Sequence, residues 1–338
     1  EEDAIVFFTL KIGNKIYSPD KLHIKGDFGK LKIGKEKKII WNAIKDFPLG
    51  IPPFFDYQIT AAGKTFKDPF TGMQFVRVRG GCFEMGDFFG DGDSNERPVH
   101  EVCVDDFYMG KYEVTMKEFK KFINETNYLT EAEKGNGCNV FINKRWVNDP
   151  NANWKNPGFL QDELHPVVCI SWNDVLAFIE WLRKNTLINY RLPTEAENEY
   201  AARSGGKKYK YSWGDASLSG NVADESAKRQ FADWTVFEGY DDGYVFTAPV
   251  GNYKPNELGL YDMTGNVFEW TLDWYGEKFY KESPLNNPKG PLVGTLRTLR
   301  GGSWNNGPWG SRVSFRGRYE PNIGYNDIGF RLVIPIKE

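Results

Sequence analysis

Apolar residues near the start of the chain come in short, β-prone runs and show no clear helical period. Turns rich in Gly, Pro, Asn and Asp separate these runs, which occupy residues 4–10, 38–41 and 54–60. The pattern changes at residues 61–64, after which strand-like runs are longer and helix start signals occur. We therefore expect a small, all-β, sandwich-like domain over residues 1–65 and a larger domain over residues 66–338.

Three helices of the second domain have clear start signals. A hydroxyl residue three positions before a carboxylate, the capping-box pattern, occurs at Thr115 with Glu118, Ser171 with Asp174 and Thr194 with Glu197. Strand-like runs cover residues 73–79, 82–85 and 102–109. After residue 205 most of the chain has neither period, so the pattern predicts an α+β fold with little regular secondary structure.

The stretch from residue 299 to residue 333 has ordered ends and an irregular middle. Gly301-Gly302-Ser303-Trp304 predicts a tight turn, and residues 328–333 form a buried-strand pattern. The residues between them are rich in Gly, Asn and aromatic side chains, which suit irregular, exposed loops. Because a long loop between two fixed anchors is usually functional, we expect a ligand-contact segment at residues 305–327.

Composition and charge narrow the classes of partner. Aromatic residues make up 16% of the chain and are accompanied by 35 glycines, which suits irregular structure held by large rings. The net charge of −3, with interspersed charges, lacks the basic footprint of a nucleic-acid-binding protein. No apolar run reaches the roughly 20 residues that span a bilayer. We expect membrane association only through a lost lipid anchor.

The four cysteines offer no zinc-binding pattern. Cys82, Cys103, Cys138 and Cys169 are widely spaced, with no C-x-x-C pair among them. Cys82 and Cys103 fall in neighbouring strand-like runs. They either form a disulfide or remain buried free thiols.

Seven motifs in the second domain carry a resemblance to a known family. In order from about residue 68 to residue 336 they are MQFVRVRGGCFEMG, RPVHEVCVDDFYMGKYEVT, HPVVCISWNDV, RLPTEAENEYAAR, GLYDMTGNVFEWTLDWY, RGGSW and IGFRLV. Together they resemble the formylglycine-generating enzyme (sulfatase-modifying factor) family. The resemblance implies a variant of the C-type-lectin fold with low regular secondary structure, and the first 65 or so residues lie outside it.

The same resemblance implies two structural calcium sites. Each would combine side-chain and backbone oxygen atoms, which are the ligands that a hard cation prefers. The first site would use Asn221, the Val222 carbonyl, Asp242 and the Tyr244 carbonyl. The second site would use Asp262, the carbonyls of Gly265 and Val267, and Glu269.

The catalytic segment is where this sequence departs from the family. The enzymes oxidise a substrate cysteine with two cysteines that follow the G-G-S-W/Y motif and bind copper. Here residues 305–318 contain no cysteine, and the nearest equivalents are Asn306 and Gly310 or Ser311. Another branch of the family uses an iron site of histidines, but the three histidines of this chain are not clustered. We therefore do not expect an enzyme.

The replaced segment is similar to the variable region of proteins that diversity-generating retroelements diversify, among them a spirochaete variable protein with this fold. Aromatic and small polar side chains on irregular loops combine rigid contact area with adaptable hydrogen bonding. We therefore expect a non-enzymatic, ligand-binding display protein whose C-terminal loop surface is diversified. Its ligand contacts would be Asn305, Asn306, Trp309, Ser311, Ser314, Phe315, Tyr319, Ile323, Tyr325 and Asp327.

Three alternatives stay open. The chain could be a family oxidoreductase with an altered active site, or a structural or assembly component. Glu320-Pro321-Asn322 also matches the tripeptide of mannose-type, calcium-dependent lectins. Under the main hypothesis the chain is a monomer that binds an unidentified protein or other macromolecular ligand. It would lie on a bacterial cell surface or be secreted, with a lipoprotein anchor as one option.

Overall fold

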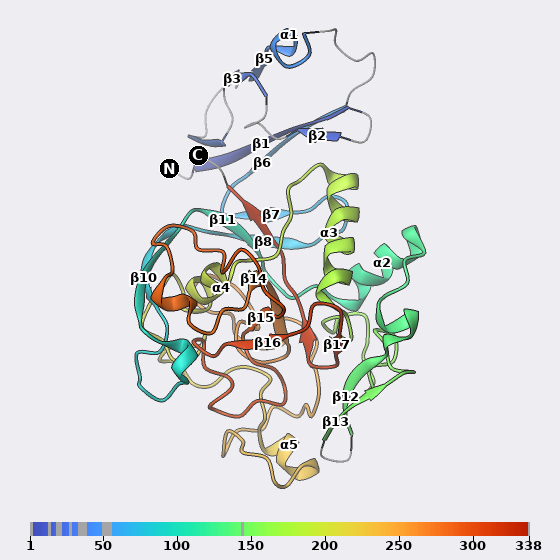
Figure 1. Cartoon of the computed structure of the whole chain (residues 1–338), viewed down its shortest axis with the longest axis vertical. Helices are drawn as coiled ribbons and strands as arrows, with labels where there is room; N and C mark the ends of the chain where they lie inside the picture. Colours follow the sequence, from blue (N-terminus) through green and yellow to red (C-terminus); the bar gives the residue numbers. More distant parts are fainter. Residues whose placement is uncertain are drawn as a thin grey trace.

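A computed structural model of the chain describes residues 3–12, 15–17, 22–26, 29–32, 39–48, 56–142 and 145–336. Helices account for 19% and strands for 24% of the residues, and irregular loops form most of the remainder. This confirms the predicted α+β fold with low regular secondary structure (Figure 1). Within the described ranges, no helix combines the length and the apolar composition that a membrane crossing requires.

The described residues before Gly63 form two small sheets and one helical turn, drawn in blue at one end of the molecule in Figure 1. The elements are β1 (Asp3–Ile12), β2 (Lys15–Tyr17), β3 (Ile24–Gly26), β4 (Gly29–Lys32), β5 (Ile39–Trp41), α1 (Ala43–Asp46) and β6 (Asp56–Ala62). Strand β1 pairs with β2, β4 and β6, and β3 pairs with β5. All three predicted runs overlap a strand, whereas the domain boundary at residue 65 stays a prediction.

Two antiparallel sheets follow. Their strands are β7 (Thr65–Lys67), β8 (Gln74–Val78), β9 (Gly81–Met85), β10 (His100–Val104), β11 (Phe107–Gly110) and β19 (Val333–Pro335). One sheet has the order β19-β11-β8-β7, and β10 pairs with β9. The single strand predicted over residues 102–109 is in fact two strands. The Asp106 carboxylate fixes the bend between them, because it accepts hydrogen bonds from the Gly80 N–H and the Arg77 guanidinium, both at 2.8 Å.

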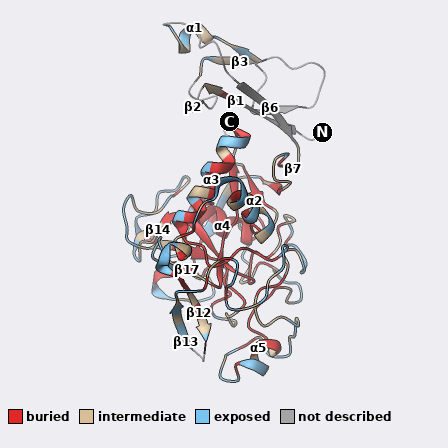
Figure 2. Ribbon diagram, turned by 90° about the vertical axis from the view of Figure 1, so that its right-hand side faces the viewer, coloured by how far each residue is buried: buried red, intermediate tan, exposed pale blue. Residues whose placement is uncertain are grey.

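The three predicted capping boxes are confirmed, each with the hydroxyl accepting from the backbone N–H three residues later. The helices are α2 (Met116–Thr126), α3 (Trp172–Thr186), α4 (Glu195–Ala202) and α5 (Glu225–Gln230), with short helical turns η2 (Ser94–Glu96), η3 (Ala132–Asn136) and η4 (Phe279–Lys281). Helices α2 and α3 pack through Phe119, Phe122 and Phe178, whose ring centroids lie 5.4–5.9 Å apart. Figure 2 shows buried residues concentrated between these helices and the sheets.

Two further sheets fix the ends of the predicted ligand-contact segment. Their strands are β12 (Cys138–Ile142), β13 (Arg145–Asp149), β14 (Phe268–Trp274), β15 (Arg297–Arg300), β16 (Gly317–Tyr319), β17 (Gly324–Tyr325) and β18 (Ile328–Gly329). One sheet has the order β16-β15-β14-β18 and the other β13-β12-β17. The segment is therefore attached to one sheet through β16 and β18, and to the other through β17.

Candidate functional site

The turn at Gly301 and Gly302 sets the direction of the segment that follows. Both glycines have positive φ, at +94° and +72°, and a Cβ on Gly302 would lie 3.0 Å from the Gly310 carbonyl oxygen. The backbone angle therefore favours glycine at both positions, and the close approach requires it at Gly302 as well. Trp304 is fully buried and its indole N–H donates to the Asn326 carbonyl at 3.3 Å, which joins the two ends of the segment.

A hydrogen-bonded cluster forms directly after this turn. Asp327 Oδ2 accepts from Asn305 Nδ2 at 2.8 Å and from Ser303 Oγ at 3.1 Å. The other carboxylate oxygen, Oδ1, is buried and has no hydrogen-bond partner among the described residues. Burial raises the pKa of Asp327 to about 6. Asp327 thus keeps one carboxylate oxygen without a hydrogen-bond donor among the described residues, and its pKa is about 6.

Asn306 and Ser311, two of the positions that the sequence resemblance matches to the family's catalytic cysteines, lie side by side. Ser311 Oγ donates to the Asn306 carbonyl at 3.0 Å, and Asn306 Oδ1 accepts from the Ser303 backbone N–H at 2.9 Å. An amide and a hydroxyl occupy this place, and neither is a soft ligand for copper(I). Thiol chemistry is therefore absent from these two positions.

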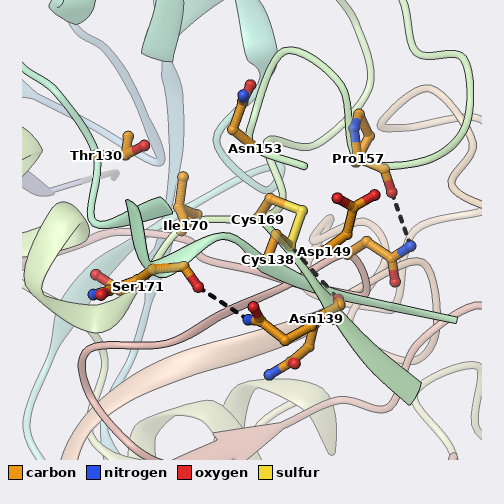
Figure 3. The surroundings of a disulfide bond; sticks show 12 residues. Thr130, Cys138, Asn139, Asp149, Asn153, Pro157, Cys169, Ile170 and Ser171 are labelled. Atoms are coloured by element: carbon orange, nitrogen blue, oxygen red, sulfur yellow. Dashed lines mark hydrogen bonds between the residues drawn. A yellow bond between two sulfur atoms is a disulfide. The ribbon is translucent and has the colours of Figure 1, made fainter. Parts of the chain in front are cut away.

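All four cysteines are oxidised in pairs. Cys82 and Cys103 face each other across β9 and β10 and form one disulfide, so the pairing left open by the sequence exists. Cys138 and Cys169 form the second, which the sequence did not reveal (Figure 3). This bond ties β12 to the chain beside β17, because Cys169 N–H donates to the Tyr325 carbonyl at 2.9 Å. The chain holds no free thiol.

Two arginines of the segment, Arg312 and Arg316, point inward, whereas Arg318 is exposed. Arg312 is 1% exposed and forms a buried ion pair with Glu96, with nitrogen–oxygen distances of 2.6 and 2.8 Å. Arg316 pairs with Glu195 in the same way, at 2.7 and 2.9 Å. Arg312 Nε also donates to the Trp309 carbonyl at 2.9 Å. Arg312 and Arg316 therefore anchor the loop to the interior of the protein.

The ten predicted contact residues do not all reach the surface. Trp309 is 51% exposed, and six more are partly buried: Asn305, Asn306, Phe315, Tyr319, Ile323 and Tyr325. Ser311, Ser314 and Asp327 are at most 4% exposed, which corrects the expectation of a continuous display face. They are buried because Ser311 and Asp327 bond within the cluster and Ser314 Oγ accepts from Arg312 at 3.1 Å.

A row of aromatic rings extends from this segment onto the β12–β13 hairpin. Tyr319 stacks on Tyr325 with ring centroids 4.0 Å apart, Tyr325 meets Trp146 at 5.7 Å, and Trp146 meets Phe141 at 5.6 Å. Trp146 is 37% exposed. Sequence reasoning missed Trp146 and Phe141, because nothing in their local pattern indicates that they lie beside Tyr325.

The first predicted calcium site contains a buried oxygen atom that accepts no hydrogen bond from the described residues. Asn221 Oδ1 is buried without a hydrogen-bond partner in the described structure, while its Nδ2 donates to the Phe246 carbonyl at 2.8 Å. Neither the Val222 nor the Tyr244 carbonyl accepts any hydrogen bond found among the described residues. Burial, together with the charge of Asp224, raises the pKa of Asp242 to about 7. These unfilled oxygen atoms fit a hard cation.

The second predicted calcium site also contains a buried oxygen atom without a hydrogen-bond partner in the described part of the chain, and it includes one further carboxylate, that of Glu113. Asp262 Oδ1 is buried without a partner among the described residues, and burial raises the pKa of Asp262 to about 6. Glu113 Oε1 is likewise unpaired, and burial and the Asp262 charge raise the Glu113 pKa. Glu269 already accepts from Arg331 Nε at 2.7 Å and from Asn198 Nδ2 at 3.0 Å. Asp262 and Glu113 thus each keep one buried oxygen atom without a partner among the described residues, whereas both Glu269 oxygen atoms accept hydrogen bonds. Sequence reasoning missed Glu113 because it lies 149 positions before Asp262.

Comparison with known proteins places most of the chain in one family. Residues 61–336 match the family described as the sulfatase-modifying factor enzyme 1-like domain. The formylglycine-generating enzyme of Streptomyces coelicolor is 36% identical over 283 residues, covering 76% of this chain and 87% of that protein. The inactive C-alpha-formylglycine-generating enzyme 2 of Bos taurus is 33% identical over 287 residues, covering 77% and 87%.

Two solved structures are similar to most of the chain. PvdO from Pseudomonas aeruginosa superposes with a TM-score of 0.64 and 29% identity, covering 80% of this chain and 97% of that chain. The Treponema denticola variable protein 1 has a TM-score of 0.56 and 21% identity, covering 80% and 98%. The second similarity supports a shared fold and nothing more.

Proposed function

The chain belongs to the family of sulfatase-modifying factor enzyme 1-like domains, and from that premise we propose that it is a non-catalytic, ligand-binding member of it. The proposal is supported by Asn306 and Ser311, which the sequence resemblance matches to the copper-binding cysteines and which lie together, since Ser311 Oγ donates to the Asn306 backbone carbonyl. Every cysteine is held in a disulfide elsewhere. A relative that is named inactive, the Bos taurus protein, shares the same domain.

The ligand would contact the exposed and half-buried aromatic residues of the segment. Trp309 projects from a loop fixed by the Arg312–Glu96 pair, so its ring is presented with little freedom to lose on binding. Large rings of this kind dominate binding energy at protein surfaces. Variation by a retroelement would be confined to side chains that bear no internal hydrogen bond, such as Ile323.

An oxidoreductase with altered chemistry is the second candidate. It is favoured by the 36% identity to a formylglycine-generating enzyme and by Asp327, whose raised pKa suits proton transfer near pH 6. The lectin alternative finds less support, because Asn326 and Asp327 beside the Glu320-Pro321-Asn322 tripeptide are buried.

Two structural calcium ions are part of the proposal. Asn221 and Asp242 would hold one with the Val222 and Tyr244 carbonyls, and Asp262 and Glu113 would join Glu269 and the Gly265 and Val267 carbonyls at the other. Such ions would connect loops in a region where few backbone hydrogen bonds of regular secondary structure connect them. The two disulfides agree with a location outside the reducing cytoplasm, and we propose a cell-surface or secreted protein.

A copper titration combined with a turnover assay tests the proposal. The purified chain would be incubated in air with copper and a cysteine-containing peptide, and the peptide's mass would be followed. We expect no copper(I) affinity above that of a surface peptide and no aldehyde product, with the Streptomyces coelicolor enzyme as positive control. Formation of the aldehyde by this chain would refute the proposal and establish the oxidoreductase.

A further inference from the structure

The hairpin of β12 and β13 ends one sheet with a free edge. Its sheet has the order β13-β12-β17, so the outer side of β13 has no partner strand among the described residues. The two strands pair in regular register from Cys138 opposite Asp149 to Ile142 opposite Arg145, with two residues between them. Figure 1 shows this hairpin at the end of the molecule opposite β1, where α5 also lies, and the Phe141 ring lies 5.4 Å from that of Phe231, which directly follows α5.

The register shows which backbone groups point outward. A two-residue connection makes the closing pair, Ile142 and Arg145, a hydrogen-bonded pair. Because the pattern alternates, the N–H and C=O groups of Trp146 and Asn148 face away from β12. Natural edge strands are usually protected by charged side chains, proline, a bulge or a covering element. The described residues of β13 include no proline or bulge, and its charged residues, Arg145 and Asp149, are confined to its two ends.

Each face of the hairpin carries one exposed apolar side chain. On one face Trp146 contacts Tyr325 and Phe141. On the other face Ile142 is 41% exposed. An added strand directs alternate side chains to opposite faces, so its residues would find an apolar contact on each side.

The charged residues at the two ends of β13 indicate which charges a strand that pairs with this edge should carry. Arg145 is exposed at one end and has no ion-pair partner among the described residues. Asp149 lies at the other end, four residues later, and its Oδ1 accepts from the Asn151 N–H at 2.9 Å. Opposite charges directly across a strand pair stabilise it, and like charges destabilise it. The edge therefore favours a strand with an acidic residue opposite Arg145 and a basic residue opposite Asp149.

We propose that the outer edge of β13 binds an extended segment of a partner polypeptide, which adds to the sheet as a fourth strand. This inference rests on the proposed binding function, because Tyr325 belongs to both surfaces. Main-chain hydrogen bonds to Trp146 and Asn148 provide the affinity, and the two charged ends and the Trp146 ring provide the selectivity. A five-residue pairing buries an area at the low end of known interfaces, so the complex is transient.

The variant Asn148→Pro tests strand addition directly. Proline at an outward-facing position keeps the β12–β13 hydrogen bonds but removes the outward N–H and blocks a new strand. The matched control, Asn148→Thr, keeps that N–H. Retention of the Cys138–Cys169 disulfide by mass spectrometry, and equal melting temperatures of the two variants, would show that the fold is intact.

The probe is a displayed library of random linear nonapeptides, panned on the full chain. We expect enriched peptides that carry an acidic and a basic residue four positions apart. They should bind wild type and Asn148→Thr equally and bind Asn148→Pro about tenfold or more weakly. N-methylation of alternate amides in an enriched peptide should abolish binding to the wild-type chain, a result that does not depend on how the proline variant folds.

Several results would overturn the inference. Peptides that bind Asn148→Pro as well as wild type, tolerance of N-methylation, or no enrichment over the unselected library would each exclude strand addition. Glycan binding that depends on Trp146, or a dimer of this chain lost in Asn148→Pro, would assign the edge to a different occupant. A ligand lost in Trp309→Ala but kept in Asn148→Pro would leave the proposed function standing and remove only this extension.

Discussion

Separating the buried pair of Glu96 and Arg312 is the sharpest test of how the binding loop is held. The two residues are 0% and 1% exposed and lie 216 positions apart in the chain. Glu96→Leu would leave the Arg312 guanidinium buried beside Ser314 and the Trp309 carbonyl without a counter-charge. Removing one partner of a buried pair costs about 3–5 kcal/mol of the free energy of unfolding. Glu96 Oε1 also accepts from the Asp93 N–H, and losing that bond adds about 1 kcal/mol.

Urea unfolding, followed by far-UV circular dichroism without reductant, measures this cost. We expect Glu96→Leu and Arg312→Met each to lose several kcal/mol, and the double variant to lose clearly less than the sum, because it leaves no unpaired charge. The exposed pair of Lys120 and Glu163 is the control, since Glu163→Gln should leave the unfolding midpoint unchanged. Single variants that cost under about 1 kcal/mol, or strictly additive costs, would refute the reasoning.

Three further predictions follow from the site. Placing thiols at Asn306→Cys and Ser311→Cys together should create copper(I) binding that neither single variant shows, measured by competition with a colorimetric chelator; equal affinity in a single variant would contradict the paired geometry. Chelation of calcium should lower the melting temperature of wild type, and less so after Asn221→Ala or Asp262→Ala; no response in wild type would argue against both sites. Burial raises the folded-state pKa of Asp327 from 3.8 to about 6. Stability should therefore fall as pH rises through that window, by about 1.4 kcal/mol per unit at most, and Asp327→Asn should remove this component in urea titrations at about pH 4.5 and 7; a parallel pH dependence in both proteins would exclude it.

Local chemistry made much of the fold predictable. Each capping box depends on residues three positions apart, and all three helices begin where Thr115, Ser171 and Thr194 indicate. The turn at Gly301 and Gly302 was equally local, because both glycines adopt positive φ. Signals of this kind are complete within a few residues, so no knowledge of the tertiary structure is needed to read them.

The site was less predictable because its contacts are long-range. The Cys138–Cys169 disulfide spans 31 positions, the Arg316–Glu195 pair 121 and the Arg312–Glu96 pair 216. Nothing in the local sequence indicates that Arg312 and Arg316 are buried, because arginines are mostly exposed. Their acidic partners lie in η2 and α4, where a carboxylate near a helix start has a sufficient local explanation. The local sequence around either residue of such a pair therefore gives no indication of its distant partner.

These buried arginines explain how an irregular segment can hold a fixed shape. A loop without a ladder leaves many carbonyl groups unpaired, and a guanidinium with five donors can satisfy several at once. Arg300 donates to the carbonyls of Val313, Ser314 and Phe315, and Arg316 donates to those of Asn95 and Gly276. The backbone geometry of the segment is thus set by side chains that a ligand never touches. Exposed rings such as Trp309 can then differ between members of the family without altering the loop, whereas exchange of an inward arginine would collapse it. Binding specificity and loop architecture are in this way assigned to different residues of one short segment.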